Sequence, residues 1–453
     1  RIEVQRGPAG VLQGSGAFSG TVNLVRKAPK ADFGGHVQAT LGSWDNTRLE
    51  ADVTGPLSAD GRIRGRVVAA GNDKDSFVNR NHNEKWLGYG IVEADLLPST
   101  TLRLSLAAQE SRTRVGYGGL PTYTDGRLID LPRSFSPDPD WNRYTWKHQE
   151  VVGELEHRFA AGWRAKFRAS NRETSSFFKD GYLTTGIDPL TMTGNYTRRK
   201  ADWDYTARDV DVNVGGPFEL FGRSHQLLLG MNYSAYLAQG KTVSSLHVAS
   251  LRVNNVRFND PPEVPDFNEA YRTGSKNRTV QRGVYGQVQL KLLDPLTLVL
   301  GGRYSDYDNE SRTVAPDPAP TAWVRGAREK HVFTPSAGLV FDASRNVSLY
   351  ASYADIFVPQ TAKQADGSVL EPRVGKQYEI GAKGEFFDRK LLATVAVFQI
   401  KDTNRSFADP ANPGFFLPLG EVESKGWELE VAGSPLRNWD ISAGYTRLET
   451  EQT

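Results

Sequence analysis

The chain of 453 residues contains no cysteine and only two methionines. Without cysteine it can form no disulfide and no thiolate metal centre, and cysteine usage gives no indication of the redox compartment. Its 55 basic and 53 acidic side chains nearly cancel and leave a net charge of +2. This balance gives no electrostatic reason to expect nucleic acid as a partner, because binding to a phosphate backbone depends on positive side chains that neutralise it.

Long apolar runs are also missing. A helix that crosses a bilayer needs about 20 predominantly apolar residues, and the longest patches here, such as 227–231, are far shorter. A helical membrane protein is therefore excluded. A transmembrane β-barrel stays possible, because its strands only alternate in hydrophobicity and its interior is polar, which fits the mean hydropathy of −0.49. The chain shows no signal peptide and begins at Arg1 within an expected strand, which indicates a piece of a longer protein.

What the sequence does contain is a period-two pattern from about residue 36 onward, with 44 glycines and 10% aromatic residues. Leu102, Leu104 and Leu106, for example, alternate with Arg103 and Ser105. Strict alternation predicts strands with one apolar and one polar face. The same pattern recurs in 284–290, 377–386 and 439–446.

Short and long connections alternate along the chain. Tight turns rich in Gly, Pro, Asp and Ser are expected near 55–62, 96–100, 159–162, 218–224, 293–296, 342–346, 387–390 and 434–438. Long polar loops are expected near 73–84, 113–143, 177–200, 241–278, 308–330, 359–373 and 403–417. Short turns at one end and long loops at the other are the organisation of outer-membrane barrels.

The pattern contains about seventeen strands, more than an open sheet normally holds without closing or splitting. Closure into a barrel also satisfies the backbone groups that lipid would leave unpaired. We therefore predict an all-β fold, a transmembrane antiparallel β-barrel. The alternative is a large soluble β protein such as a propeller, which would show a repeated blade of fixed period.

The first residues carry the most specific resemblance: RIEVQRGP at 1–8, GSGA at 14–17 and GTVNLV at 20–25. This segment resembles the end of the plug domain of TonB-dependent receptors. Two strands around a glycine-rich turn can pack closely inside a barrel wall, because glycine permits close backbone approach.

Further segments resemble ferric-coprogen and ferric-pyoverdine receptors of the same family. They are DG at 125–126, DLPRS at 130–134, WN at 141–142, LEHRF at 155–159, LYASY at 349–353, GKQYEIG at 375–381 and GEVESKGWE at 420–428. The resemblance implies a 22-stranded barrel around a plug, with residues 1–30 as the end of the plug and 31–453 as a barrel truncated at its C-terminus. The TonB box, most of the plug and the closing strands are then absent from this chain, and whether a signalling domain precedes the plug is left open.

By this resemblance the protein is an outer-membrane receptor that imports a ferric siderophore, of hydroxamate or mixed type, into the periplasm. Its partners would be the siderophore, the TonB complex of the inner membrane, and the surrounding outer-membrane lipid and lipopolysaccharide. No cofactor is expected, since the iron travels within the siderophore. The same fold importing haem, cobalamin or a glycan is the alternative, and an outer-membrane enzyme or adhesin is a more distant one.

An importer of bulky, charged ligands needs aromatic and cationic side chains at its outer mouth. Interface anchoring and loop packing are the alternative roles for each aromatic residue there. The expected substrate-binding residues are Tyr117, Tyr123, Trp141, Tyr182, Trp203, Tyr205, Tyr236, Tyr304 and Tyr307.

Enzymatic chemistry finds little support in the sequence. Gly14, Gly16 and Gly20 are spaced like a dinucleotide-binding motif, but a β-branched strand follows them where that motif requires a helix. The seven histidines show no metal-ligand spacing. No serine sits in a nucleophile elbow. We therefore expect neither a catalytic group nor a metal site.

Overall fold

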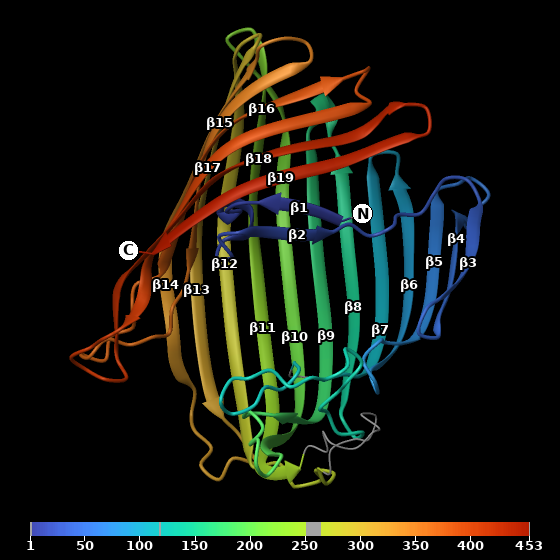
Figure 1. Ribbon diagram of the computed structural model, residues 1–453. Helices are drawn as coiled ribbons and strands as arrows, with labels where there is room; N and C mark the ends of the chain where they lie inside the picture. The colour runs from blue at the N-terminus through green and yellow to red at the C-terminus, as the bar shows by residue number, and fades with distance from the viewer. Residues whose placement is uncertain (1, 117–118, 251–263, 453) are drawn as a thin grey trace.

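Antiparallel strands make up almost all regular structure in the computed structural model, which describes residues 2–116, 119–250 and 264–452. In this described part, seventeen strands form one sheet rolled into a barrel, and successive strands pair with one another (Figure 1). The all-β barrel prediction is confirmed. Among the described residues, no helix has both the length and the apolar character that crossing a membrane requires.

The barrel strands are, in chain order, β3 (Gly34–Gly42), β4 (Asn46–Pro56), β5 (Ile63–Asp75), β6 (His82–Leu97), β7 (Thr100–Arg114), β8 (Arg143–Arg158), β9 (Arg164–Leu183), β10 (Thr193–Leu220), β11 (Arg223–Ser250), β12 (Thr273–Leu293), β13 (Leu296–Thr313), β14 (Val324–Asp342), β15 (Val347–Val358), β16 (Arg373–Phe386), β17 (Leu391–Ala408), β18 (Phe416–Leu436) and β19 (Trp439–Gln452). A 3₁₀ turn, η1 (Ala160–Gly162), joins β8 to β9.

The expected tight turns all join strands at one end of the barrel, the short-turn end, and the longer connections lie at the other, the long-loop end. The expected loops 177–200 and 241–278 are shorter than the sequence suggested. Fifteen of the 24 residues in 177–200 and sixteen of the 38 in 241–278 belong to β9, β10, β11 and β12, and β10 and β11 reach 28 residues each. At about 3.3 Å per residue such strands are roughly 90 Å long, so they stand well beyond a bilayer core of about 30 Å.

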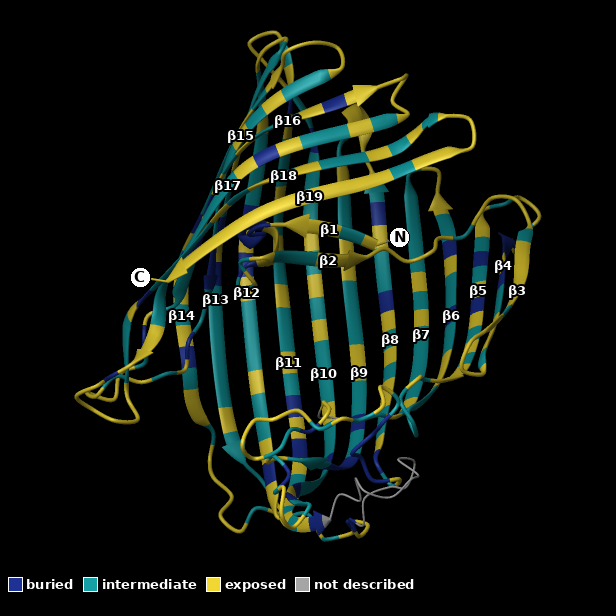
Figure 2. Cartoon of the chain, viewed as in Figure 1, coloured by how far each residue is buried: buried dark blue, intermediate teal, exposed yellow. Residues whose placement is uncertain are grey.

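The two faces of the sheet differ as the alternation predicts. Leu104 and Leu106 on β7 are more than half exposed and point outward. Arg103, between them in the alternation, points inward and lies 2.8 Å from Glu154 of β8. Figure 2 shows the resulting bands of exposed and less exposed residues along the strands.

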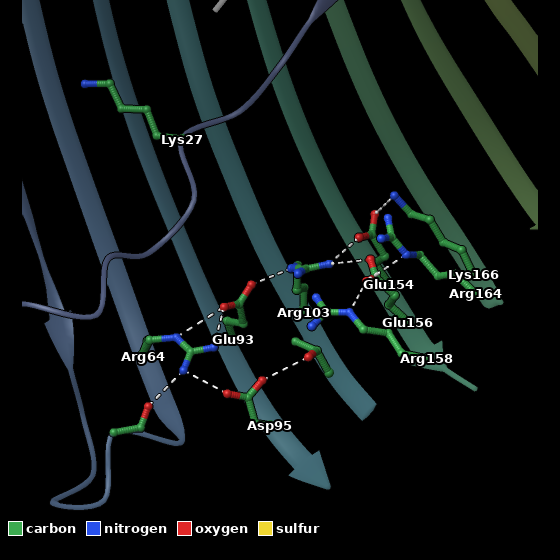
Figure 3. Close-up of polar contacts among 12 residues, drawn as sticks. Lys27, Arg64, Glu93, Asp95, Arg103, Glu154, Glu156, Arg158, Arg164 and Lys166 are labelled. Carbon is green, nitrogen blue, oxygen red and sulfur yellow. Dashed lines mark hydrogen bonds and ion pairs between the residues drawn. The ribbon is translucent and has the colours of Figure 1, made fainter. Parts of the chain in front are cut away.

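The inward charges form a continuous network on β5 to β9 near the short-turn end (Figure 3). It runs from Arg64 through Glu93, Arg103 and Glu154 to Lys166, with the Arg64–Glu93 and Lys166–Glu154 pairs at 2.6 and 2.8 Å. Each of the two glutamates lies between two cations. The half-buried charged groups of this network form ion pairs with one another. Glu93 and Glu154 can therefore stay charged on the interior face of the wall.

An N-terminal hairpin, which we call the inner segment (residues 2–33), lies across the interior of the barrel (Figure 1). It contains β1 (Ile2–Arg6) paired antiparallel with β2 (Gly20–Leu24), and between them the single helical turn α1 (Gly10–Gln13). Ser15 Oγ donates a hydrogen bond to Gln281 of β12 at 2.6 Å, and the Gln281 amide donates to the carbonyl of Gln13 at 2.6 Å. Arg6 pairs with Glu428 of β18 at 2.9 Å. The expected close packing of a glycine-rich turn against the wall is confirmed.

Described loop residues at the long-loop end pack against one another. In loop 115–142 the Asp138 side chain is 6% exposed, Ser136 Oγ donates to it at 3.0 Å, and an Arg80 guanidinium N–H donates to the Asp138 carbonyl at 3.1 Å. In the described part of the chain, the other carboxyl oxygen is buried without a hydrogen-bond partner. Burial therefore raises the pKa of Asp138 to about 6, because desolvation disfavours the charged form.

Two glycines of the inner segment, Gly10 in α1 and Gly16 after it, give a first prediction. A Cβ on Gly10 would lie 2.3 Å from the carbonyl oxygen of Asp355, whereas a Cβ on Gly16 would meet nothing nearer than Ile356 Cδ1 at 3.4 Å. Gly10→Ala should therefore weaken docking of the inner segment by about 1–3 kcal/mol, the usual cost of overpacking. The measurement is hydrogen exchange of residues 9–16 in the full-length protein, with Gly16→Ala as the matched control. Equal protection in both variants would contradict the packing described.

The second prediction concerns pH. The folded pKa of Asp138 lies above its ordinary value, so the loop binds the proton more tightly than the unfolded chain does, and its stability falls as pH rises through about 6. Hydrogen-exchange protection of residues 132–142, corrected for intrinsic rates, should drop by roughly tenfold between pH 5 and pH 8. Asp138→Asn, which resembles the neutral acid, should abolish that drop. The same pH dependence in wild type and variant would count against the assignment.

Candidate functional site

A row of nearly parallel rings lies on the interior face toward the long-loop end. It consists of Trp146 and His148 on β8, Trp203 and Tyr205 on β10, and Tyr236 on β11, and we call it the aromatic group. Ring centroids are 6.1 Å apart for Trp146–His148 and Trp203–Tyr205, 6.4 Å for Trp146–Tyr205 and 6.2 Å for Tyr205–Tyr236. The interplanar angles are between 8° and 21°.

Small residues on the neighbouring strands make room for these rings. On β9, Ser176 stands between Trp146 and Trp203 in the register, and Thr174 stands between His148 and Tyr205. Rings from β8 and β10 can therefore approach each other across β9. Thr174 Oγ1 lies 2.9 Å from His148 Nδ1 and fixes the imidazole.

On β11, Gly240 stands opposite Trp203 in the register. A Cβ there would lie only 2.2 Å from Trp203 Cδ2. The indole can therefore lie flat against the wall because this residue is glycine.

A contact of the inner segment shows on which face of the wall, and at what height, the aromatic group lies. Glu150 follows His148 on the same face of β8, and it pairs with Arg26 of the inner segment. The aromatic group is thus on the interior face, two to four residues farther toward the long-loop end than this contact. Trp146 is 39% exposed and Tyr236 is 42% exposed, so ring surface is open to the interior.

Three of the nine residues expected from the sequence join the aromatic group: Trp203, Tyr205 and Tyr236. Sequence reasoning missed Trp146 and His148. The sequence signal that could have found them is the alternation of Tyr144, Trp146 and His148. It gives one aromatic face to a strand that begins at the long-loop end.

Three other expected residues have partners that hold the loops together. Trp141 Nε1 donates to the carbonyl of Val264 at 2.9 Å. Tyr123 packs against the buried cluster around Phe135 and Ile187. Tyr182 lies on β9 rather than in a loop, with the Arg199 guanidinium 4.9 Å from its ring centre.

The remaining three lie elsewhere. Tyr304 points outward from β13, is 58% exposed and packs on Phe333 with centroids 4.9 Å apart, as an interface anchor would. Tyr307 is on the interior face opposite Gln281, at the level of the inner segment. Tyr117 lies outside the described residues.

One group in the described part of the chain brings three metal-ligand types together: His36, Glu50 and Asp52, with ligand atoms within 4.8 Å. Cations of the protein already occupy it. Lys27 pairs with Asp52 at 2.6 Å, and the Arg66 guanidinium binds both Asp52 oxygens at 2.7 and 2.6 Å. The charge that a metal ion would neutralise is therefore satisfied by side chains.

The arrangement is suited to binding. Parallel, partly exposed aromatic faces stack on flat conjugated ligands and attract cations. A concave interior wall with a few polar groups among apolar rings is the usual form of a ligand site.

Comparison with known proteins gives the same architecture. A family described as TonB dependent receptor-like, beta-barrel, matches residues 88–453. The ferripyoverdine receptor of Pseudomonas aeruginosa is 33% identical over 460 residues, covering 98% of this chain and 55% of the relative. The ferrioxamine B receptor of Salmonella typhimurium is 27% identical, covering 98% of this chain and 62% of the relative. The chain thus spans little more than half the length of these curated relatives.

Solved structures agree. The ferripyoverdine receptor of the outer membrane of Pseudomonas aeruginosa, bound to ferripyoverdine, has a TM-score of 0.89 and 30% identity, with 100% of this chain and 60% of that chain covered. The alcaligin outer-membrane receptor of Bordetella pertussis has a TM-score of 0.75 and 28% identity, with coverage of 100% and 67%. This chain therefore belongs to the TonB-dependent receptor family and forms part of its outer-membrane β-barrel.

Proposed function

We propose that the protein binds a ferric siderophore in the barrel interior, on the aromatic group, and imports it into the periplasm. The observation that carries the proposal is the row of open, parallel rings above the inner segment. Ferric siderophores are bulky and often conjugated, and they present faces that aromatic rings can stack against. The iron would arrive within the siderophore, so the protein needs no metal ligands of its own.

The relatives support this class of cargo. Two of the relatives are named for ferripyoverdine and ferrioxamine B. The names of these relatives favour a hydroxamate or mixed siderophore. The resemblance of loop 115–142 to ferric-coprogen and ferric-pyoverdine receptors favours the same class. The family consists of receptors, and we propose no catalytic activity.

We further propose that residues 1–30 are the end of a plug and 31–453 the barrel wall, and that transport is driven through the TonB complex. The contacts of the inner segment support this division. They include hydrogen bonds and an ion pair to Gln281 and Glu428 of the wall. Water can replace such polar contacts when the segment moves, at a net cost of about 1 kcal/mol for each hydrogen bond. Outer-membrane lipid and lipopolysaccharide would surround the wall.

The third prediction tests the cargo and its site together. The full-length receptor would be titrated with a panel of ferric siderophores, haem and cobalamin, and binding would be followed by quenching of tryptophan fluorescence. A ferric hydroxamate siderophore should quench at submicromolar concentration. Trp203→Leu should weaken its binding by about three- to tenfold, because one aromatic stacking contact contributes about 0.5–1.5 kcal/mol. Trp203→Phe should weaken it less.

Two controls make the test specific. Trp439→Leu removes an exposed indole at the short-turn end and should leave affinity unchanged. Iron-free siderophores report binding that does not depend on the metal. Tight binding of haem or cobalamin, with no response to any ferric siderophore, would leave the barrel in place and overturn the proposed cargo.

A further inference from the structure

A buried arginine on the interior wall lacks a counter-ion. Arg303 of β13 is 0% exposed, and it makes no ion pair with any residue that the structure describes. Tyr285 stands opposite it on β12, and the Tyr285 hydroxyl donates to the Asp211 carboxylate at 2.9 Å. Arg303 thus differs from the paired charges of β5 to β9. A buried charge without a counter-ion destabilises the state that buries it, so packing alone does not explain an arginine at this position.

The wall itself orients the guanidinium. Arg303 Nε donates to Ser305 Oγ at 2.7 Å, and Nη2 donates to Asn232 Oδ1 at 2.7 Å. A Cβ on Gly283 would lie 2.0 Å from Nη2, so the side chain can cross β12 because this residue is glycine. Both acceptors are neutral and belong to β13 and β11, and the guanidinium therefore keeps its orientation when the inner segment moves. Its third nitrogen, Nη1, is buried and has no hydrogen-bond partner among the described residues.

The inner segment covers this guanidinium with a glycine. A Cβ on Gly14 would lie 3.0 Å from Arg303 Nε and 2.2 Å from Gln281 Nε2, so both side chains converge on the place that Gly14 occupies. The Gln281 amide bonds to Gln13 and Ser15, which also belong to the inner segment. Withdrawal of the inner segment would therefore uncover Arg303 and release Gln281 together. The two groups can then donate to one oxygen anion.

The covered pair lies between the aromatic group and the short-turn end. Tyr236 of the aromatic group is on β11, and Asn232, which accepts from Arg303, follows on the same face of that strand toward the short-turn end. At about 3.3 Å per residue, the guanidinium is roughly 13 Å beyond the ring. Cargo that leaves the aromatic group for the periplasm would pass this height of the wall.

We propose that Arg303 and Gln281 form a transit site for an anionic group of the cargo, a carboxylate above all, which opens only while the inner segment is withdrawn. A guanidinium suits a carboxylate because it stays charged and its N–H groups match two oxygens. The inference rests on the proposed function for the passage of cargo, but the anion site itself can be tested without a siderophore.

The first test is hydrogen exchange of residues 9–16 in the full-length receptor, in potassium acetate and in potassium chloride of the same ionic strength. An anion that binds only the withdrawn state favours withdrawal by mass action, so about 0.5 M acetate should speed exchange in wild type about threefold relative to chloride. Arg303→Gln should abolish this difference. The matched control, Lys383→Gln, removes another interior cation, which lies over the Tyr350 ring, and should respond as wild type does.

The same experiment separates a binding role from a structural one. Without acetate, protection of residues 9–16 in Arg303→Gln should equal or exceed that of wild type, because the change removes an unpaired buried charge. Lower protection would show that Arg303 holds the inner segment in place and would overturn the proposal, as would an equal acetate response in both proteins. Arg303→Lys keeps the charge, should keep part of the response, and replaces the glutamine variant if that one does not fold.

A second test measures passage. N-acetyl and N-succinyl ferrioxamine B carry the same iron centre and differ by one carboxylate. Arg303→Gln should slow import of the succinyl form about tenfold relative to the acetyl form, because one hydrogen bond to a charged group contributes about that factor. The affinity of both forms, followed by tryptophan quenching, should stay unchanged.

The outcomes of this second test are separable from the cargo. An equal effect of Arg303→Gln on import of both forms would overturn the transit site. A wild-type receptor that imports neither form would count against the proposed hydroxamate cargo, and the acetate response would then decide whether Arg303 binds an anion.

Discussion

In a bilayer the backbone N–H and C=O groups of a strand have no water to bond, so each must pair with a neighbouring strand. The rest of this structure follows from that constraint. It forces the strands into one rolled sheet, and a sheet with lipid outside and water inside must alternate apolar and polar side chains. The inward charges then need partners, which they find in one another across β5 to β9 and in the inner segment through Arg6, Arg26 and Lys27.

The candidate site uses the same geometry. A period of two puts aromatic side chains of β8, β10 and β11 on one face, and the antiparallel register puts them at one height. The small residues between the rings allow them to form one surface. Ser176 and Thr174 on β9 and Gly240 on β11 leave the rings room to lie against the wall. The inner segment lies across the interior below the rings and pairs with the wall through Arg6, Arg26 and Lys27. A site beside a separable segment is suited to capture followed by release.

Much of this could be predicted from the sequence because period two and turn chemistry are local signals. All the tight turns were found, since glycine, proline and aspartate act within a few residues. The long-loop end was predicted less well: the polar residues of 177–200 and 241–278 looked like loops, yet water-exposed strands above a membrane need no apolar face. Tyr304 is in phase with Leu298 and Leu300 and stands opposite Phe333 of β14 in the register. Its expected contact with cargo stays a prediction.

Trp146 was missed because its role depends on residues distant in sequence. The indole matters through Ser176, Trp203 and Tyr205, which register brings beside it and which no local motif links to it. Loop packing by Trp141 likewise depends on Val264, more than a hundred residues away.

The central claim is that cargo rests on the aromatic group, and the most direct measurement is an anomalous difference map at the iron edge. Crystals of the full-length receptor soaked with a ferric hydroxamate siderophore should give one iron peak in the barrel interior, facing Trp146, Trp203 and Tyr236. An iron peak elsewhere, over the outer loops or on the outer wall, would contradict the account.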